Sequence, residues 1–139
     1  MQPPGYSGTP LAKKLGIKAG FTVRLVHEPP YYFELFTDIP EDVKFLTEKK
    51  TKKNLVHYFT KKSSELNSDI IALRHEIHPN GMIWISWPKK ASKIVTDLTE
   101  DVVRALALSN GLVDIKVCAV DETWSGLKLV IPVKDRKVG

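Results

Sequence analysis

The segment from Leu55 to Trp87 constrains the fold more than any other part of this sequence. Leu55–Phe59 is apolar at nearly every position, which is typical of a strand buried on both faces of a sheet. A helix with one apolar face is indicated by apolar residues that recur at spacings of four, three and four, namely Leu66, Ile70, Leu73 and Ile77. After a predicted turn at His78–Gly81, Met82–Trp87 is a second apolar strand. Strand, helix and strand in this order predict a parallel pair with a helical crossover.

The remaining periodicities extend this unit. Helices are predicted at 9–16, 31–36 and 98–109, and strands at 21–26, 43–47, 113–120 and 127–133. Only residues 121–126 join the last two strands, so these strands should pair antiparallel. The connection from Thr47 to Leu55 is too short for a helical crossover, which leaves the direction of strand 43–47 open. The predicted fold is an α/β, Rossmann-like three-layer sandwich with a mainly parallel mixed sheet and a C-terminal antiparallel hairpin.

Length and composition fit one folded domain over residues 1–139. Hydrophobic residues make up 42% and charged residues 27%, which is typical of a globular chain. No run approaches the ~20 apolar residues of a membrane span, and residues 1–10 lack the apolar stretch of a signal peptide. The lone Cys118 fits a reducing compartment. We therefore expect a cytoplasmic protein that does not associate with membranes.

The net charge of +5 comes from 21 Lys plus Arg against 16 Asp plus Glu. Most of the cations are lysines, whereas bidentate recognition of bases or phosphates usually recruits Arg. The run Lys49–Lys53, with Lys61 and Lys62, has two interpretations. It either holds a nucleic-acid backbone nonspecifically or is a solvated lysine loop that protects an edge strand, and we prefer the second.

Two resemblances follow from these segments. The layout resembles the second half of a class I methyltransferase in its helices, turn, strand and closing hairpin, at Leu66–Ile77, His78–Gly81, Met82–Trp87, Leu98–Ser109 and 113–133. The chain also resembles a family of small bacterial proteins known only as a domain of unknown function, through Gly5–Leu11, Trp87–Ser92, Thr96–Val103 and Val117–Gly126. The second resemblance carries no activity with it.

The place where a methyltransferase or dinucleotide-binding protein keeps a glycine-rich turn is different here. Such a turn lets the backbone approach the ligand and presents free N–H groups at a helix start. Val26–Tyr32 has no glycine, two prolines without N–H groups, and two tyrosine rings. Glu48 lies at the distance of a ribose-binding acid, although a soluble strand often ends in Glu. We expect no cofactor, and neither S-adenosylmethionine nor a dinucleotide, at the end of the first strand.

Ligands of open α/β sheets sit beyond the carboxyl ends of the strands, where four polar loops should gather. The candidate ligand-binding residues in these loops are His27, Lys61, Lys62, Ser63, Trp87, Lys89, Lys90, Ser92, Asp121, Glu122, Thr123 and Trp124. Ammonium groups, hydroxyls, indoles and the start of the helix near Ser63 would suit a small anionic or phosphate-bearing ligand. The alternative is that these loops are ordinarily polar and that the Trp rings cover the sheet ends.

No residue pattern predicts a catalytic or metal site. His75 and His78 lie three residues apart without a third ligand at a diagnostic spacing, so we expect no metal. His57 should be a hydrogen-bonded core histidine and Cys118 a packed thiol.

The sequence alone leaves the function unknown. The leading hypothesis is a non-enzymatic binding or interaction module for a small anionic ligand or a protein partner at the carboxyl edge of the sheet. The first alternative is an enzyme of degenerate methyltransferase-like fold, with Asp121, Glu122, His27 or Lys89 in proton transfer at the same edge. The second is nonspecific nucleic-acid binding through the lysine runs. The oligomeric state stays open.

Overall fold

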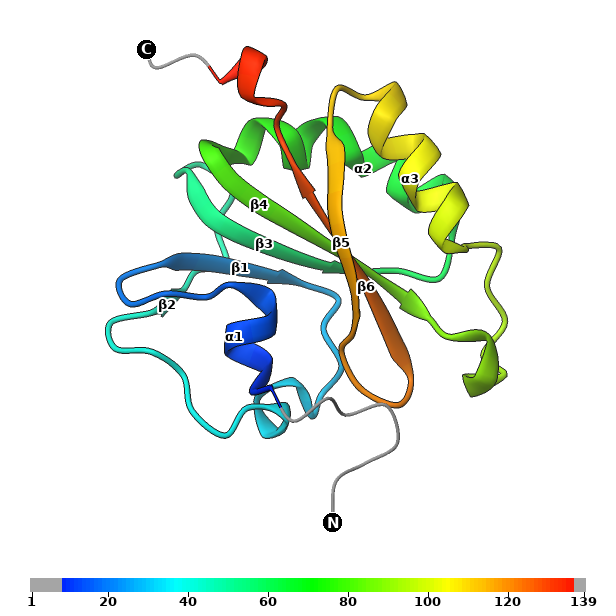
Figure 1. The fold of residues 1–139 in the computed structure, drawn as a ribbon, viewed down its shortest axis with the longest axis horizontal. Helices are drawn as coiled ribbons and strands as arrows, with labels where there is room; N and C mark the ends of the chain where they lie inside the picture. Colours follow the sequence, from blue (N-terminus) through cyan, green and yellow to red (C-terminus); the bar gives the residue numbers. More distant parts are fainter. Residues whose placement is uncertain (1–8, 137–139) are drawn as a thin grey trace.

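The strands predicted from the apolar segments join into one mixed sheet in the computed structural model, which describes residues 9–136 (Figure 1). The elements are α1 (Leu11–Leu15), β1 (Thr22–Val26), η1 (Tyr32–Leu35), β2 (Lys44–Phe45), β3 (Lys53–Phe59), α2 (Ser63–Glu76), β4 (Ile77–Pro88), η2 (Lys90–Ser92), α3 (Glu100–Ser109), β5 (Val113–Ala119), β6 (Trp124–Val130) and η3 (Val133–Asp135), where η marks a short 3-10 helix. The strand order is β2-β1-β3-β4-β6-β5, with β6 antiparallel to both of its neighbours. The α/β Rossmann-like fold class with its C-terminal hairpin is therefore confirmed.

The structure settles the direction of β2, which is parallel to β1. β2 pairs through Thr22↔Lys44 and Val23↔Phe45, at the beginning of β1. Because β2 ends near the amino edge of the sheet, residues 46–52 are long enough to reach the start of β3 on the far side of β1. No helix is needed in this crossover.

Helices cover both faces of the sheet, as a three-layer sandwich requires. One apolar cluster packs α1 and η1 against the sheet, and the other packs α2 and α3 against the opposite face. β3 serves both clusters, since Leu55 and Phe59 face α1 while Val56 and Tyr58 face α2, and each is at most 1% exposed. The Trp84 indole donates a hydrogen bond to the Leu15 carbonyl oxygen at 2.8 Å, which fastens α1 to the sheet.

The predicted turn at His78–Gly81 is wrong, because α2 ends at Glu76 and β4 begins at Ile77. Ile77 pairs with Lys53, and the register shifts before Leu55 pairs with Met82. The residues read as a turn therefore lie in an irregular stretch of the strand. A Cβ on Gly81 would approach the carbonyl oxygens of His78 and Lys53 to 3.0 Å, so this close passage of two strands requires glycine.

No helix within residues 9–136 is long and apolar enough to cross a bilayer. The string Gly5–Gly8, part of the resemblance to small bacterial proteins, lies outside the described residues.

His57 is the polar centre of the core and is fully buried. Its Nδ1 is 2.9 Å from Tyr32 Oη, and its Nε2 is 2.8 Å from Ser86 Oγ. Burial lowers the pKa of His57 to about 3, so the ring is neutral. The prediction of a hydrogen-bonded core histidine is confirmed.

This histidine should make folding sensitive to mild acid. Between pH 6.5 and 3 the unfolded chain binds a proton that folded His57 does not, so stability falls as pH drops. We expect unfolding free energies from urea titrations to decline between pH 7 and pH 5 with a slope approaching about 1.4 kcal/mol per pH unit. His57→Asn, which cannot titrate, should be less stable at pH 7 and should lose most of this slope. Parallel curves for the two proteins would contradict the assignment.

Candidate functional site

The parallel strands β1 and β3 form the switch point of the sheet, where the connections that follow the two strands lead to opposite sides. β1 leads to β2 on one side, while β3 and β4 lie on the other, so the loops that follow β1 and β3 diverge. A cavity of about 630 Å³ opens between them. We call it the switch-point cavity; it is lined by His27, Glu28, Pro29, Pro30, Tyr31, Phe59, Thr60, Lys61, Lys62, Glu65, Ile94, Thr123 and Trp124.

Aromatic and proline side chains form much of the cavity wall. Phe59 and Trp124 meet edge to face with ring centroids 5.1 Å apart, and both are under 10% exposed. Pro29 is buried beside them in the loop after β1. Rigid apolar walls of this kind suit a flat or apolar ligand body.

Charged side chains of both signs lie at the same cavity. Lys61 and Lys62 are exposed, and within residues 9–136 their ammonium groups form no ion pair. His27 Nδ1 lies 3.6 Å from a Glu65 carboxylate oxygen, a contact that becomes an ion pair when the imidazole is protonated. Glu28 is exposed and is not paired in the described chain. The cavity thus presents two ammonium groups that lack a carboxylate partner, alongside the carboxylates of Glu28 and Glu65.

His27 has a backbone conformation that residues other than glycine rarely adopt. Its φ is +55°, in the left-handed region, directly after β1. The side chain is exposed, and its ring centroid lies 6.1 Å from that of Tyr58. Strain of this kind is concentrated at functional positions, which makes His27 a candidate ligand contact.

Asp121 shapes the cavity wall through its hydrogen bonds. Tyr31 Oη donates to one carboxylate oxygen at 2.7 Å, and the backbone N–H groups of Thr123 and Trp124 donate to the other at 2.8 and 2.7 Å. Burial, followed by the bond to Asp121, raises the pKa of Tyr31 and keeps the phenol protonated. Asp121 thus ties the β5–β6 loop to the segment after β1.

The loop after β1 has none of the geometry of a glycine-rich phosphate loop. The Tyr32 N–H donates to the Pro29 carbonyl at 2.9 Å, and η1, a single short turn, stands where a long helix would begin. Glu48 is also engaged, because Lys53 Nζ and Thr51 Oγ1 donate to its carboxylate at 3.0 and 2.9 Å. These bonds lower the pKa of Glu48 to about 2. That no cofactor binds at the end of β1 stays a prediction.

Five of the residues proposed from sequence line the cavity together: His27, Lys61, Lys62, Thr123 and Trp124. The other seven, Ser63, Trp87, Lys89, Lys90, Ser92, Asp121 and Glu122, are not among its lining residues. Trp87 packs in the core under α2 and α3. The Ser63 amide and hydroxyl both donate to Asp97, at 2.8 and 2.6 Å, so a carboxylate already caps α2. Ser92 Oγ donates to the Lys89 carbonyl within the loop after β4.

Sequence reasoning did not identify several lining residues. Phe59 and Thr60 could have been identified from their position, because they lie at the carboxyl end of β3, the edge of the sheet where the cavity opens. Ile94 could not be found this way, because its loop is held by a bond from Thr96 Oγ1 to the Lys61 carbonyl, 35 residues apart. No group of three metal-ligating side chains occurs among the described residues.

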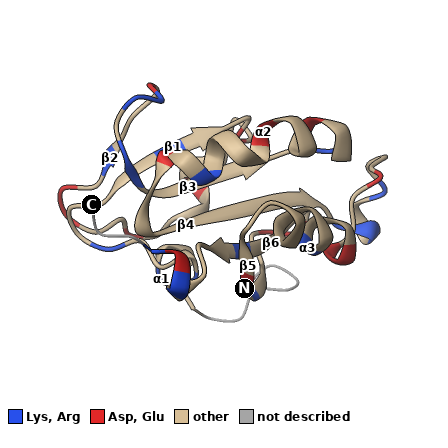
Figure 2. Ribbon diagram, turned by 90° about the horizontal axis from the view of Figure 1, so that it is seen from above, with Lys and Arg blue, Asp and Glu red and all other residues tan. Residues whose placement is uncertain are grey.

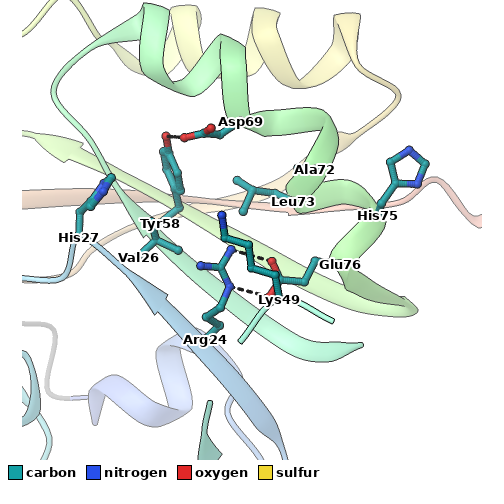
Figure 3. Close-up of a pocket in the computed structure, with 10 residues that line it drawn as sticks. All are labelled: Arg24, Val26, His27, Lys49, Tyr58, Asp69, Ala72, Leu73, His75 and Glu76. Atoms are coloured by element: carbon teal, nitrogen blue, oxygen red, sulfur yellow. Dashed lines mark hydrogen bonds and ion pairs between the residues drawn. The ribbon is translucent and has the colours of Figure 1, made fainter. Parts of the chain in front are cut away.

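A second cavity, of about 360 Å³, lies on the α2 side of β1 (Figure 3). Its lining residues are Arg24, Val26, His27, Lys49, Tyr58, Asp69, Ala72, Leu73, His75 and Glu76. At its floor Arg24 makes two hydrogen bonds to Glu76, at 2.6 and 2.7 Å, and Lys53 Nζ lies 3.3 Å from the same carboxylate.

The lysine run 49–53 differs from a solvated loop. Lys53 is fully buried, and Lys52 Nζ donates to the His75 carbonyl at 2.5 Å. The prediction of a solvated lysine loop is therefore wrong for Lys53, because the sequence does not show that Lys53 pairs with Glu48 and with the buried Glu76. Figure 2 shows Lys and Arg positions interspersed with Asp and Glu positions along the ribbon.

Comparison with known proteins identifies the fold. No family model matches the chain, and no curated protein matches it, so the resemblance to small bacterial proteins stays a prediction. Solved structures do match. A SAM-dependent methyltransferase from Aquifex aeolicus is similar with a TM-score of 0.59 at 15% identity, over 87% of this chain and 88% of that one.

Two further solved structures are similar in fold. Magnesium protoporphyrin IX methyltransferase from Synechocystis PCC 6803 with bound SAH is similar with a TM-score of 0.54 at 12% identity, over 87% of this chain and 78% of that one. A complex of DhpI with SAH is similar with a TM-score of 0.57 at 9% identity, over 88% of this chain and 82% of that one. The chain has a methyltransferase-like Rossmann fold, and these identities show the fold alone.

The strain at His27 can be tested through stability. Asp42, with φ +59°, is a matched position outside the two cavities. We expect His27→Gly and Asp42→Gly each to raise the urea-unfolding free energy by up to about 1 kcal/mol, because strain is relieved while glycine costs chain entropy. If His27→Gly destabilises the protein while Asp42→Gly does not, the His27 side chain serves folding rather than a ligand.

Proposed function

We propose that this protein is a small-molecule-binding protein whose ligand occupies the switch-point cavity. The observation that carries the proposal is a cavity of about 630 Å³ at the carboxyl ends of β1 and β3, the edge at which open α/β sheets bind ligands. Its size falls within the usual range for small-molecule sites.

The lining supports a ligand with a flat or apolar body and an anionic group. Phe59 and Trp124 supply an aromatic wall, against which a ring can pack. Lys61 and Lys62 supply ammonium groups that have no carboxylate partner in residues 9–136. A carboxylate or phosphate on the ligand would provide that partner through charge-assisted hydrogen bonds.

A second candidate function is catalysis by an enzyme of degenerate methyltransferase-like fold. The structural neighbours, which are SAM-dependent methyltransferases, support this candidate more than they support simple binding. A local observation also favours it, since Tyr31 lines the cavity and its hydroxyl is held by Asp121 at 2.7 Å, where it could orient a reacting group. The candidate requires that SAM bind in this cavity, and the prolines after β1 and the engaged Glu48 argue against that.

The binding proposal is tested by a thermal-shift screen of nucleotides and aromatic carboxylates. A ligand at 100 times its dissociation constant adds about 2.7 kcal/mol of stability, which a melting curve detects. For a ligand found this way, Lys61→Gln/Lys62→Gln should weaken binding at least about tenfold, because two charge-assisted hydrogen bonds are lost.

Lys13→Gln/Lys50→Gln is the matched control, which removes the same charge from exposed lysines outside the cavity. It should leave the affinity within about twofold, since distant surface charges are screened by salt. Equal losses in the two double variants would mean diffuse electrostatic attraction and would contradict a site at this cavity.

A further inference from the structure

The second cavity has a charge arrangement that the switch-point cavity and its proposed ligand do not explain. It lies on the α2-facing side of β1, beside the last turns of α2 (Figure 3). β1 presents Arg24 there, because the short crossover from β2 to β3 places no helix over this part of the sheet. A buried guanidinium therefore borders an open space instead of a packed layer.

The acidic groups at this cavity already have partners. Glu76 accepts two hydrogen bonds from Arg24, at 2.6 and 2.7 Å, and is 3.3 Å from Lys53 Nζ. Asp69 accepts a hydrogen bond from Tyr58 Oη at 2.5 Å, and Figure 3 shows this pair at the far end of the cavity from Arg24. Glu76 is therefore balanced by two cations, whereas Asp69 keeps its negative charge beside the neutral Tyr58 phenol, at the end of the cavity away from Arg24.

Two basic groups at the same cavity retain unused donors. Arg24 reaches Glu76 through Nε and Nη2, and its Nη1 makes no hydrogen bond within residues 9–136. Lys49 Nζ likewise has no partner in the described chain. Figure 3 shows the Lys49 ammonium and the Arg24 guanidinium extending into the same space.

The Arg24 donor is also rigidly held. Its side chain is 10% exposed and is fixed by the two bonds to Glu76, which is itself 4% exposed and contacts Lys53. A guanidinium fixed in this way loses little conformational entropy when its remaining N–H group binds a ligand. Lys49, on an exposed loop, can adjust to the second oxygen of the same ligand.

We infer that the second cavity is a binding site for a small oxyanion, a phosphate or carboxylate group held between Arg24 Nη1 and Lys49 Nζ. The cavity of about 360 Å³ is larger than a single oxyanion, so it would accept this group as part of a larger molecule. The inference rests on Arg24 and Lys49 and is independent of the ligand proposed for the switch-point cavity.

The test is a nuclear magnetic resonance titration of the full chain with inorganic phosphate, at constant ionic strength set by chloride. A parallel titration with acetate distinguishes a phosphate site from a carboxylate site. With at least one anion, we expect the amide signals of residues 24–27 and 49 to shift until they saturate. The dissociation constant obtained from these shifts should lie in the millimolar range. Lys49→Gln should weaken this binding at least about tenfold, because a charge-assisted hydrogen bond is lost.

Lys50→Gln is the matched control, since it removes the next lysine of the same loop, which does not line the cavity. It should bind as the unmodified protein does, and so should Lys61→Gln/Lys62→Gln, which changes only the switch-point cavity. Absence of saturable shifts with both anions, or equal weakening by Lys49→Gln and Lys50→Gln, would overturn the inference. Either result leaves the proposal for the switch-point cavity standing.

Discussion

The buried carboxylate of Glu76 is the contact on which the arrangement of β1 and β3 depends. It ends α2 and receives Arg24 from β1 and Lys53 from β3, so one side chain joins three elements. A buried ion pair adds little net stability over apolar packing, but removing one partner costs about 3–5 kcal/mol because the other charge is left unpaired. The cluster thus adds a side-chain link to the backbone ladder that already pairs the two strands. It does so where the chain crosses from β2 to β3 without a helix.

Both cavities follow from the arrangement of these two strands. β1 and β3 are adjacent and parallel, and the chain leaves them toward opposite sides, which opens the switch-point cavity beyond their carboxyl ends. The missing crossover helix leaves the α2-facing side of β1 open, and the second cavity forms there. The methyltransferase-like fold therefore surrounds a first loop that contains two prolines and two tyrosines and no glycine.

Local periodicity was sufficient to predict the fold class, the final hairpin and most of the helices and strands. The strand at Leu55–Phe59 is the best case, because its double-sided burial follows directly from its composition. The rule that ligands sit at the carboxyl ends of strands selected twelve residues, of which His27, Lys61, Lys62, Thr123 and Trp124 line one cavity. The contacts that could not be predicted join residues that are distant in the chain. Ser63 donates a hydrogen bond to Asp97, and Lys53 forms an ion pair with Glu76. A turn-like sequence also misled, since Gly81 serves a close passage of strands instead of a turn.

We expect that this methyltransferase-like fold binds neither S-adenosylmethionine nor S-adenosylhomocysteine at the end of β1. Calorimetric titration with S-adenosylmethionine and with S-adenosylhomocysteine tests it most directly, because backbone hydrogen bonds worth about 1 kcal/mol each are missing after β1. We expect no saturable heat of binding at micromolar concentrations of either compound. Stoichiometric micromolar binding that a bulky substitution, Glu28→Trp, abolishes would contradict the account and would make the enzyme the better proposal.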